Sequence, residues 1–224
     1  MSVQSVLSLA TVPDINALRL AHGFGKLSDE GVLNAALHLQ NQQSGSRELP
    51  LYQQRIIAVS VVNIAPDQAV EMFSLGPNES SEASLINRFF NLLADSSTLI
   101  AWDFSTEIQP LINISRLRNP MAGTVRIAQG IDLSDAILGP THGPTTSLLD
   151  FATSLGLAPV VNTTQSDSIE CLLSNDFGQL YKATNQQALM TALLFSQWQA
   201  SIGAISADAH KTCYTSLTAL MTKA

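Results

Sequence analysis

The chain has 224 residues, of which 46% are hydrophobic and 13% are charged, so it can bury one sizeable core and we expect a single domain over residues 1–224. Eighteen acidic residues against eleven scattered basic ones give a net charge of -7. This balance argues against the basic surface that is typical of nucleic-acid-binding proteins. No segment reaches the roughly 20 apolar residues of a membrane span, and no basic stretch precedes the first apolar run, so we expect a cytoplasmic protein without a signal peptide or membrane contact.

Patterns of β-strands dominate the first third of the chain. Residues 5–14 form an apolar run that ends in a proline turn, and residues 28–39 predict a helix that begins at a serine cap. A polar loop follows over residues 40–50. Residues 55–64 are rich in β-branched side chains and predict a buried central strand, and residues 69–75 predict the next strand across a short turn. The three strands together predict an antiparallel meander.

The middle of the chain changes to helical spacing and then returns to a strand. Residues 79–94 carry one apolar stripe with a helical period, and residues 98–102 follow as a short strand. A strand, helix and strand in this order require a crossover, which places the new strand parallel to the first one and makes the sheet mixed. Beyond it, residues 107–118 are predicted to be helical and residues 124–127 extended.

The last third of the chain is predicted to be almost entirely helical. Its expected helices cover residues 147–155, 168–174, 178–200 and 206–221, and Gly156 is a stop signal for the first of them. Cys171 and Cys213 lie in apolar helical sequence without a second ligand nearby, so we interpret both as small core residues.

Several short segments resemble a known family. Residues 8–14 read Ser-Leu-Ala-Thr-Val-Pro-Asp, which is similar to the first motif, Asp-Ile-Glu-Thr-Val-Pro-Asp, of the predicted 3′-5′ exonucleases related to the proofreading domain of family B DNA polymerases. Residues 99–102 resemble the Leu-Val-Ser-Trp that precedes the second acidic motif of that family, and the proline that ends this motif is kept at position 110. Residues 183–187 align with the last motif, Tyr-Cys-Glu-Thr-Asp. Further similar segments are residues 54–59, 81–90, 131–135 and 147–157.

The resemblance implies a fold and a chemistry. The fold is an α/β ribonuclease-H-like one, with a mixed five-stranded sheet flanked by helices and a helical C-terminal third. The chemistry is hydrolysis by two divalent ions about 4 Å apart, which activate water and stabilise the leaving oxygen. Hard cations such as Mg²⁺ require carboxylate oxygens for this purpose.

The residues that align with the chemical positions of the family are neutral. The four metal-binding acids align with Ser8, Ala10, Ile108 and Gln187, and the tyrosine that handles the proton aligns with Ala183. None of these side chains carries a negative charge, so we expect no metal ion, no cofactor and no catalytic residue at these vestigial positions. Burying carboxylates without a metal is costly, and neutral replacements such as Ala10 should therefore stabilise a protein that has lost its chemistry.

Other acids near the same sheet edge could replace the lost ligands, and they are Asp14, Asp103, Glu107, Asp132 and Asp135. Each also has a structural interpretation. Asp103 is suited to cap a helix, Glu107 to be a first-turn charge favoured by the helix dipole, and Asp132 and Asp135 to begin a loop or helix.

Two main hypotheses follow. In the first, the protein is a degenerate exonuclease, a pseudoenzyme, that serves as a non-catalytic binding or scaffolding protein. Its former cleft would be lined by the five neutral positions, a more apolar surface suited to a protein partner, to self-association or to a small ligand. In the alternative, it is a working 3′-5′ exonuclease on nucleic acid that holds Mg²⁺ or Mn²⁺ with relocated ligands, drawn from Asp103, Glu107 and Asp132. Nucleic-acid binding without cleavage is a third possibility, which the net charge of -7 disfavours.

Overall fold

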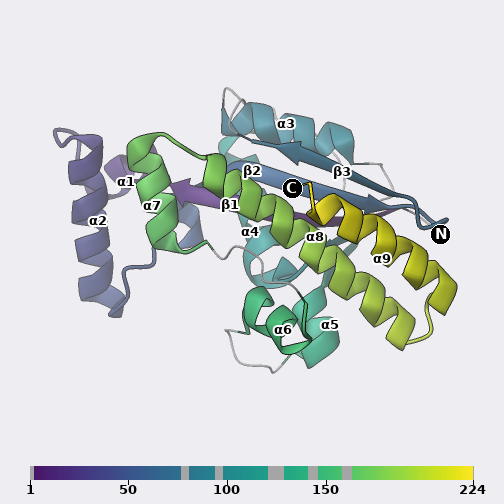
Figure 1. The fold of residues 1–224 in the computed structure, drawn as a ribbon. Coiled ribbons are helices and arrows are strands. Elements are labelled where there is room, and N and C mark those ends of the chain that lie inside the picture. Colours follow the sequence, from purple (N-terminus) through teal and green to yellow (C-terminus); the bar gives the residue numbers. More distant parts are fainter. Residues whose placement is uncertain are drawn as a thin grey trace.

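The protein is built around a mixed sheet (Figure 1). The computed structural model describes residues 3–76, 81–93, 98–120, 129–140, 146–157 and 163–223. Within them the sheet has five strands in the order β3-β2-β1-β4-β5. The strands are β1 (Gln4–Pro13), β2 (Gln54–Ile64), β3 (Val70–Leu75), β4 (Thr98–Ala101) and β5 (Gln129–Asp132).

The strand directions follow the predicted plan. β1 pairs antiparallel with β2, and β2 pairs antiparallel with β3, which confirms the meander. β4 lies parallel to β1 on its other side, as the crossover through a helix requires, and β5 lies parallel to β4. The extended segment predicted at residues 124–127 lies outside the described residues, and the strand found is β5.

Helices cover both faces of the sheet. Side chains alternate between the faces along each strand, so Leu7 and Leu9 of β1 pack with α3 (Glu82–Leu92) and α4 (Gln109–Arg118). Val6 packs on the opposite face with α8 (Gly178–Ser201) and α9 (Ala207–Met221). Figure 1 shows α8 and α9 lying side by side across the near face. The mixed sheet with helices on both faces and a helical C-terminal third confirms the predicted ribonuclease-H-like α/β class.

Two helices after β1 form a smaller layer at one end of the sheet. α1 (Ile15–His22) was not predicted, and it is defined by the Asp14 cap at its start and by Gly23, with φ of 69°, at its end. α2 (Asp29–Ser44) begins after Ser28 as predicted but continues through residues 40–44, which we had predicted to be loop. These polar residues are compatible with a solvent-facing helix. Both helices share a small core with Ile169 of α7 (Gln165–Ser174), and the three lie together in Figure 1.

Of the remaining helices, the one that follows β5 was not predicted, whereas α6 to α9 agree with the sequence patterns. α5 (Leu133–Leu138) follows β5, and α6 (Leu148–Ser154) ends before Gly156, whose φ is 73°. Cys171 and Cys213 are both buried and unpaired, as expected. In the described ranges, no helix combines the length and the hydropathy needed to cross a membrane.

Candidate functional site

A cavity of about 480 Å³ lies at the end of β1 and β4. Its floor comes from residues 7–11 of β1 and from residues 101–103 at the end of β4. Its walls come from α8 through Leu180, Gln187 and Thr191, and from three connecting segments. These segments are residues 48–54 before β2, residues 147–149 at the start of α6 and residues 163–168 at the start of α7. The volume is in the range of small-molecule sites.

Two of the vestigial positions are in direct contact across this cavity. Ser8 lies on the α8 face of β1, and its Oγ donates a hydrogen bond of 3.0 Å to Oε1 of Gln187. Both residues line the cavity although 179 positions separate them in the chain. Ala10 lies two residues further along the same face, is 8% exposed and packs in one cluster with Leu180. Neutral groups that satisfy one another therefore occupy the junction of β1 and α8.

The other two vestigial positions lie deeper. Ile108 lines the cavity, is 7% exposed and belongs to the core between the sheet and α3 and α4. Ala183 is fully buried and does not line the cavity, so the expectation that all five positions form its surface is wrong for this residue.

Acidic side chains line the cavity near these positions. Asp103 immediately precedes a π-helical turn, η2 (Phe104–Ile108), that joins β4 to α4, and Glu107 lies within this turn. The carbonyl of Asp103 accepts the N–H groups of Glu107 at 3.1 Å and of Ile108 at 3.2 Å. Such wide turns are rare and often occur at functional sites. Glu48, from the segment before β2, is the third acidic residue of the lining.

The structural interpretation needs correction for Asp103, while Glu107 occupies the predicted first turn. Asp103 makes no side-chain capping bond to the helical turn that it precedes. Glu107 does lie in the first turn, but the pKa of its carboxyl is raised, first by desolvation and then by the negative charge of Asp103. Its side chain keeps access to solvent through the cavity, while the protein that surrounds the cavity on the other sides causes the desolvation.

Substitution of Glu107 should make the stability of the protein less sensitive to pH. A carboxyl whose folded-state pKa is above its ordinary value of 4.5 destabilises the folded protein as pH rises past that value, because the charged form is disfavoured. We expect Glu107→Gln to be more stable than the natural chain at pH 8 and equally stable near pH 4, in thermal unfolding. Glu71→Gln removes an exposed acid of β3 and is the matched control. A Glu107→Gln variant that is less stable at pH 8 would contradict this account.

Both carboxylate oxygens of Asp132 accept hydrogen bonds from neighbouring residues. It caps α5, and its Oδ1 accepts hydrogen bonds from the N–H of Asp135 at 3.2 Å and from Ser134 Oγ at 2.8 Å. Its Oδ2 accepts the N–H of Ser105 at 2.8 Å, which ties η2 to α5. Asp132 does not line the cavity. The interpretation of Asp132 as the start of a helix is confirmed, and this removes it from the possible ligands of the cavity.

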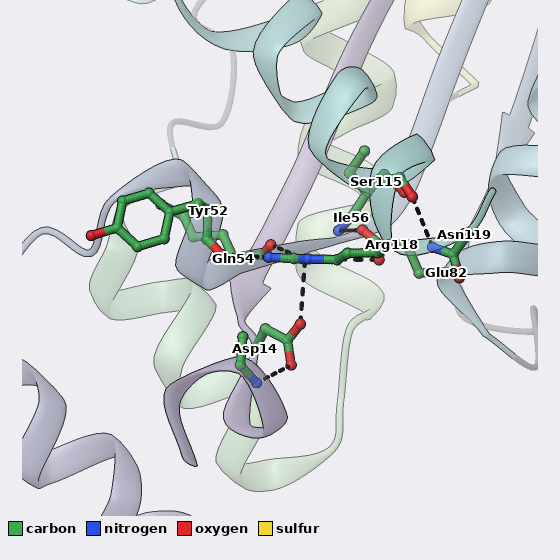
Figure 2. Close-up of polar contacts among 9 residues, drawn as sticks. Asp14, Tyr52, Gln54, Ile56, Glu82, Ser115, Arg118 and Asn119 are labelled. Atoms are coloured by element: carbon green, nitrogen blue, oxygen red, sulfur yellow. Dashed lines mark hydrogen bonds and ion pairs between the residues drawn. The ribbon is translucent and has the colours of Figure 1, made fainter. Parts of the chain in front are cut away.

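Asp14 is likewise structural, through a network around Arg118 that Figure 2 shows. The Arg118 guanidinium lies 3.3 Å from Oδ2 of Asp14 and 3.9 Å from Oε2 of Glu82. It also donates to the backbone carbonyls of Tyr52 and Gln54. One side chain thus joins the end of α4 to the starts of α1, β2 and α3.

The network fixes one wall of the cavity. Gln54, whose carbonyl accepts the Arg118 hydrogen bond, uses its own amide to bond the carbonyl of Leu49 at 2.7 Å and the hydroxyl of Thr11. Gln54, Leu49 and Thr11 all line the cavity. Sequence reasoning missed Gln54 and Glu48 as site residues, because both lie in or next to a segment that reads only as a polar loop.

The lining also corrects the expected character of the cleft. We expected a more apolar surface, but hydroxyl and amide side chains accompany the three acids. These are Ser8, Thr11, Gln54, Ser147, Thr163, Thr164, Gln165, Ser168, Gln187 and Thr191. The apolar replacements at positions 10 and 108 are outnumbered by polar residues from the connecting segments. Among the described residues, no three His, Cys, Asp or Glu side chains are grouped so as to hold a metal ion.

The strand order and the cavity at the ends of the parallel strands define an α/β protein of the ribonuclease-H-like class. A family model described as a predicted 3′-5′ exonuclease related to the exonuclease domain of PolB matches residues 46–124, about a third of the chain. This match confirms the resemblance over β2, β3, α3, β4 and α4. It does not extend to β1 or α8. No curated protein matches the chain.

Proposed function

We propose that this protein is an exonuclease-related domain over residues 1–224 that no longer hydrolyses phosphodiesters and acts by binding a ligand or partner at its cavity. The observation that carries the proposal is the hydrogen bond between Ser8 and Gln187. In the family that the chain resembles, acids at these two aligned positions belong to the metal-binding set. Here a hydroxyl and an amide satisfy each other.

Metal-ion chemistry needs charge at this junction. Two Mg²⁺ ions that activate water and stabilise a leaving oxygen are held by carboxylates together with the phosphates of the substrate. Ser8, Ala10, Ile108 and Gln187 supply no carboxylate, and Ala183 supplies no group to orient water. The net charge of -7 adds long-range repulsion of a nucleic-acid substrate.

A second candidate function is a nuclease with relocated ligands, and one observation favours it. Asp103 and Glu107 both line the cavity, close enough for the charge of one to raise the pKa of the other. Against it, Asp132 is committed to capping α5, and the described residues contain no group of three ligands. A pair of carboxylates alone is a poor site for two divalent ions.

A nuclease assay separates the two candidates. We expect purified protein with Mn²⁺ or Mg²⁺ to leave an end-labelled single-stranded DNA intact, since the four aligned ligand positions are neutral. The assay is read on a sequencing gel. A ladder of shortened products that disappears in Glu107→Gln, purified in the same way, would establish the relocated-ligand nuclease. A ladder that persists in that variant would point to a contaminating enzyme.

A further inference from the structure

We propose that two copies of this chain pair along β3, so that their sheets join into one continuous sheet. The pairing is antiparallel, and a two-fold axis passes through it at Met72. It is independent of the cavity, because none of the residues 70–75 lines that space.

β3 is an open edge of the sheet. It pairs with β2 on one side, and no strand in the described part of the chain pairs with its other side. The outer side of an edge strand presents a row of N–H and C=O groups to which a further strand can bond. Proline, lysine or a β-bulge ordinarily protects such an edge. The six residues of β3 contain no proline or lysine, pair with β2 without a register shift and carry one charge, at Glu71.

The hairpin between β2 and β3 determines which backbone groups point outward. The N–H of Ala65 donates to the carbonyl of Ala69 at 2.9 Å, and the N–H of Gln68 donates to the carbonyl of Ala65 at 2.9 Å. With Gln68 at φ of 68°, these bonds define a three-residue loop that ends in a bulge. Bonded and non-bonded pairs alternate along the antiparallel ladder from this point. Residues 71, 73 and 75 therefore bond to β2, whereas residues 70, 72 and 74 direct their N–H and C=O groups outward.

The outward groups of β3 are complementary to those of a second copy. In an antiparallel pairing centred on Met72, residue 70 lies opposite residue 74 of the other copy, and the two Met72 residues lie opposite each other. Each outward N–H then meets an outward carbonyl, as in a closed two-fold interface. Glu71 lies opposite Phe73 of the second copy, so no like charges face each other across the junction.

The edge strand is anchored to the body of each copy before any pairing. The hydroxyl of Ser74 donates to Oδ1 of Asn185 in α8 at 2.8 Å. Val70 and Met72 pack against the core beneath α8 and α9. A strand that is already ordered loses less conformational entropy on association, which favours pairing.

The helix beside this edge carries no charge along most of its length. α8 contacts β1 and β2, whereas α9 contacts β3 and lies on the β3 side of α8 (Figure 1). In the joined sheet the two α9 helices would be the elements of this face nearest to the two-fold axis. Residues 212–221 of α9 include no charged side chain, and Tyr214 is 39% exposed. Two such helices can approach without electrostatic repulsion, and tyrosine is a residue type enriched in interfaces.

Sedimentation velocity of the full chain at increasing concentration tests the proposal. We expect the mass to rise from the 24.0 kDa of one chain towards twice that value. Phe73→Glu and Phe73→Lys form a matched pair of variants, because both remove the same aromatic ring. A glutamate at position 73 would face Glu71 of the second copy at two symmetric places, whereas a lysine would form ion pairs there. We expect the dimer dissociation constant of Phe73→Glu to be at least about tenfold higher than that of Phe73→Lys.

Amide hydrogen exchange of the natural chain identifies the paired strand directly. The N–H groups of residues 70, 72 and 74 should exchange more slowly in concentrated than in dilute protein. Those of residues 71 and 73 should not change, because they already bond to β2. This measurement decides the question even if circular dichroism shows that both Phe73 variants are unfolded.

Three results would overturn the proposal. The first is the mass of a single chain at every concentration. The second is a dimer that folded Phe73→Glu and Phe73→Lys form equally well, which would place the interface elsewhere. The third is hydrogen exchange at residues 70, 72 and 74 that does not depend on protein concentration.

Discussion

The double variant Ser8→Asp and Gln187→Asp should need a divalent cation for the full stability of its folded state. In the natural chain, Ser8 Oγ and Gln187 Oε1 are 3.0 Å apart and share one hydrogen bond. Two carboxylates at this distance repel each other in a partly buried site, so we expect the double variant Ser8→Asp and Gln187→Asp to lose about 3 kcal/mol of unfolding free energy without metal. Mn²⁺ should restore much of this loss, because binding to the folded state alone stabilises it. Thermal unfolding with and without Mn²⁺ measures both effects.

A neutral pair of similar size is the control for this experiment. Ser8→Asn with Gln187→Asn changes the volume in the same way and adds no charge, so its stability should not respond to Mn²⁺. A double aspartate variant that matches this control in stability and in metal response would mean that β1 and α8 do not bring the two positions together. A quadruple variant that also carries Ala10→Glu and Ile108→Asp has acids at all four aligned positions. We expect it to bind Mn²⁺ more tightly than the double aspartate variant.

Loss of the Arg118 side chain should destabilise the folded protein strongly. Arg118→Met would leave the carboxylates of Asp14 and Glu82 without their cation, and these side chains are only 16% and 12% exposed. It would also remove donors from the carbonyls of Tyr52 and Gln54. Breaking a buried ion pair on one side costs about 3–5 kcal/mol, and we expect a loss near the lower end because Arg118 is itself partly exposed. Urea unfolding measures the change.

Two further variants test the origin of this effect. Arg118→Lys keeps the charge but not the fork of donors that bonds two carbonyls at once, so it should recover only part of the stability. Arg47→Met removes an exposed arginine of the segment before β2 and should change the unfolding free energy by less than about 0.5 kcal/mol. Equal effects of Arg47→Met and Arg118→Met would show that the network contributes little.

Most strands and helices could be predicted from the sequence, because the local spacing of apolar residues determines these elements. Alternation and β-branched residues indicated β1 to β3, and the buried stripe of Leu85, Ile86, Phe89 and Phe90 indicated α3. The crossover rule then gave the direction of β4. α1 was missed because only eight residues lie between its cap and its terminal glycine, too few for a clear helical period.

The chemistry of the site was harder to predict, because it depends on contacts between distant segments. Neutral residues at positions 8 and 187 were visible by resemblance, but their mutual hydrogen bond was not. Glu48 and Gln54 enter the cavity from a polar segment with no motif, and the acidic character of the cleft was missed with them. Asp103 and Glu107 read as ordinary helix-start residues, since no sequence pattern indicates that a π-helical turn follows β4.

The cavity is assembled from side chains that span residues 7 to 191, so its completeness depends on nearly the entire length of the polypeptide. A small molecule that fits there can recognise only the finished tertiary structure, because no partial fold contains both the β1 floor and the α8 wall. A molecule bound in the cavity would therefore stabilise β1 and α8 together. In hydrogen exchange, amides of both segments should slow together when the site is filled, even where they make no contact with the bound molecule.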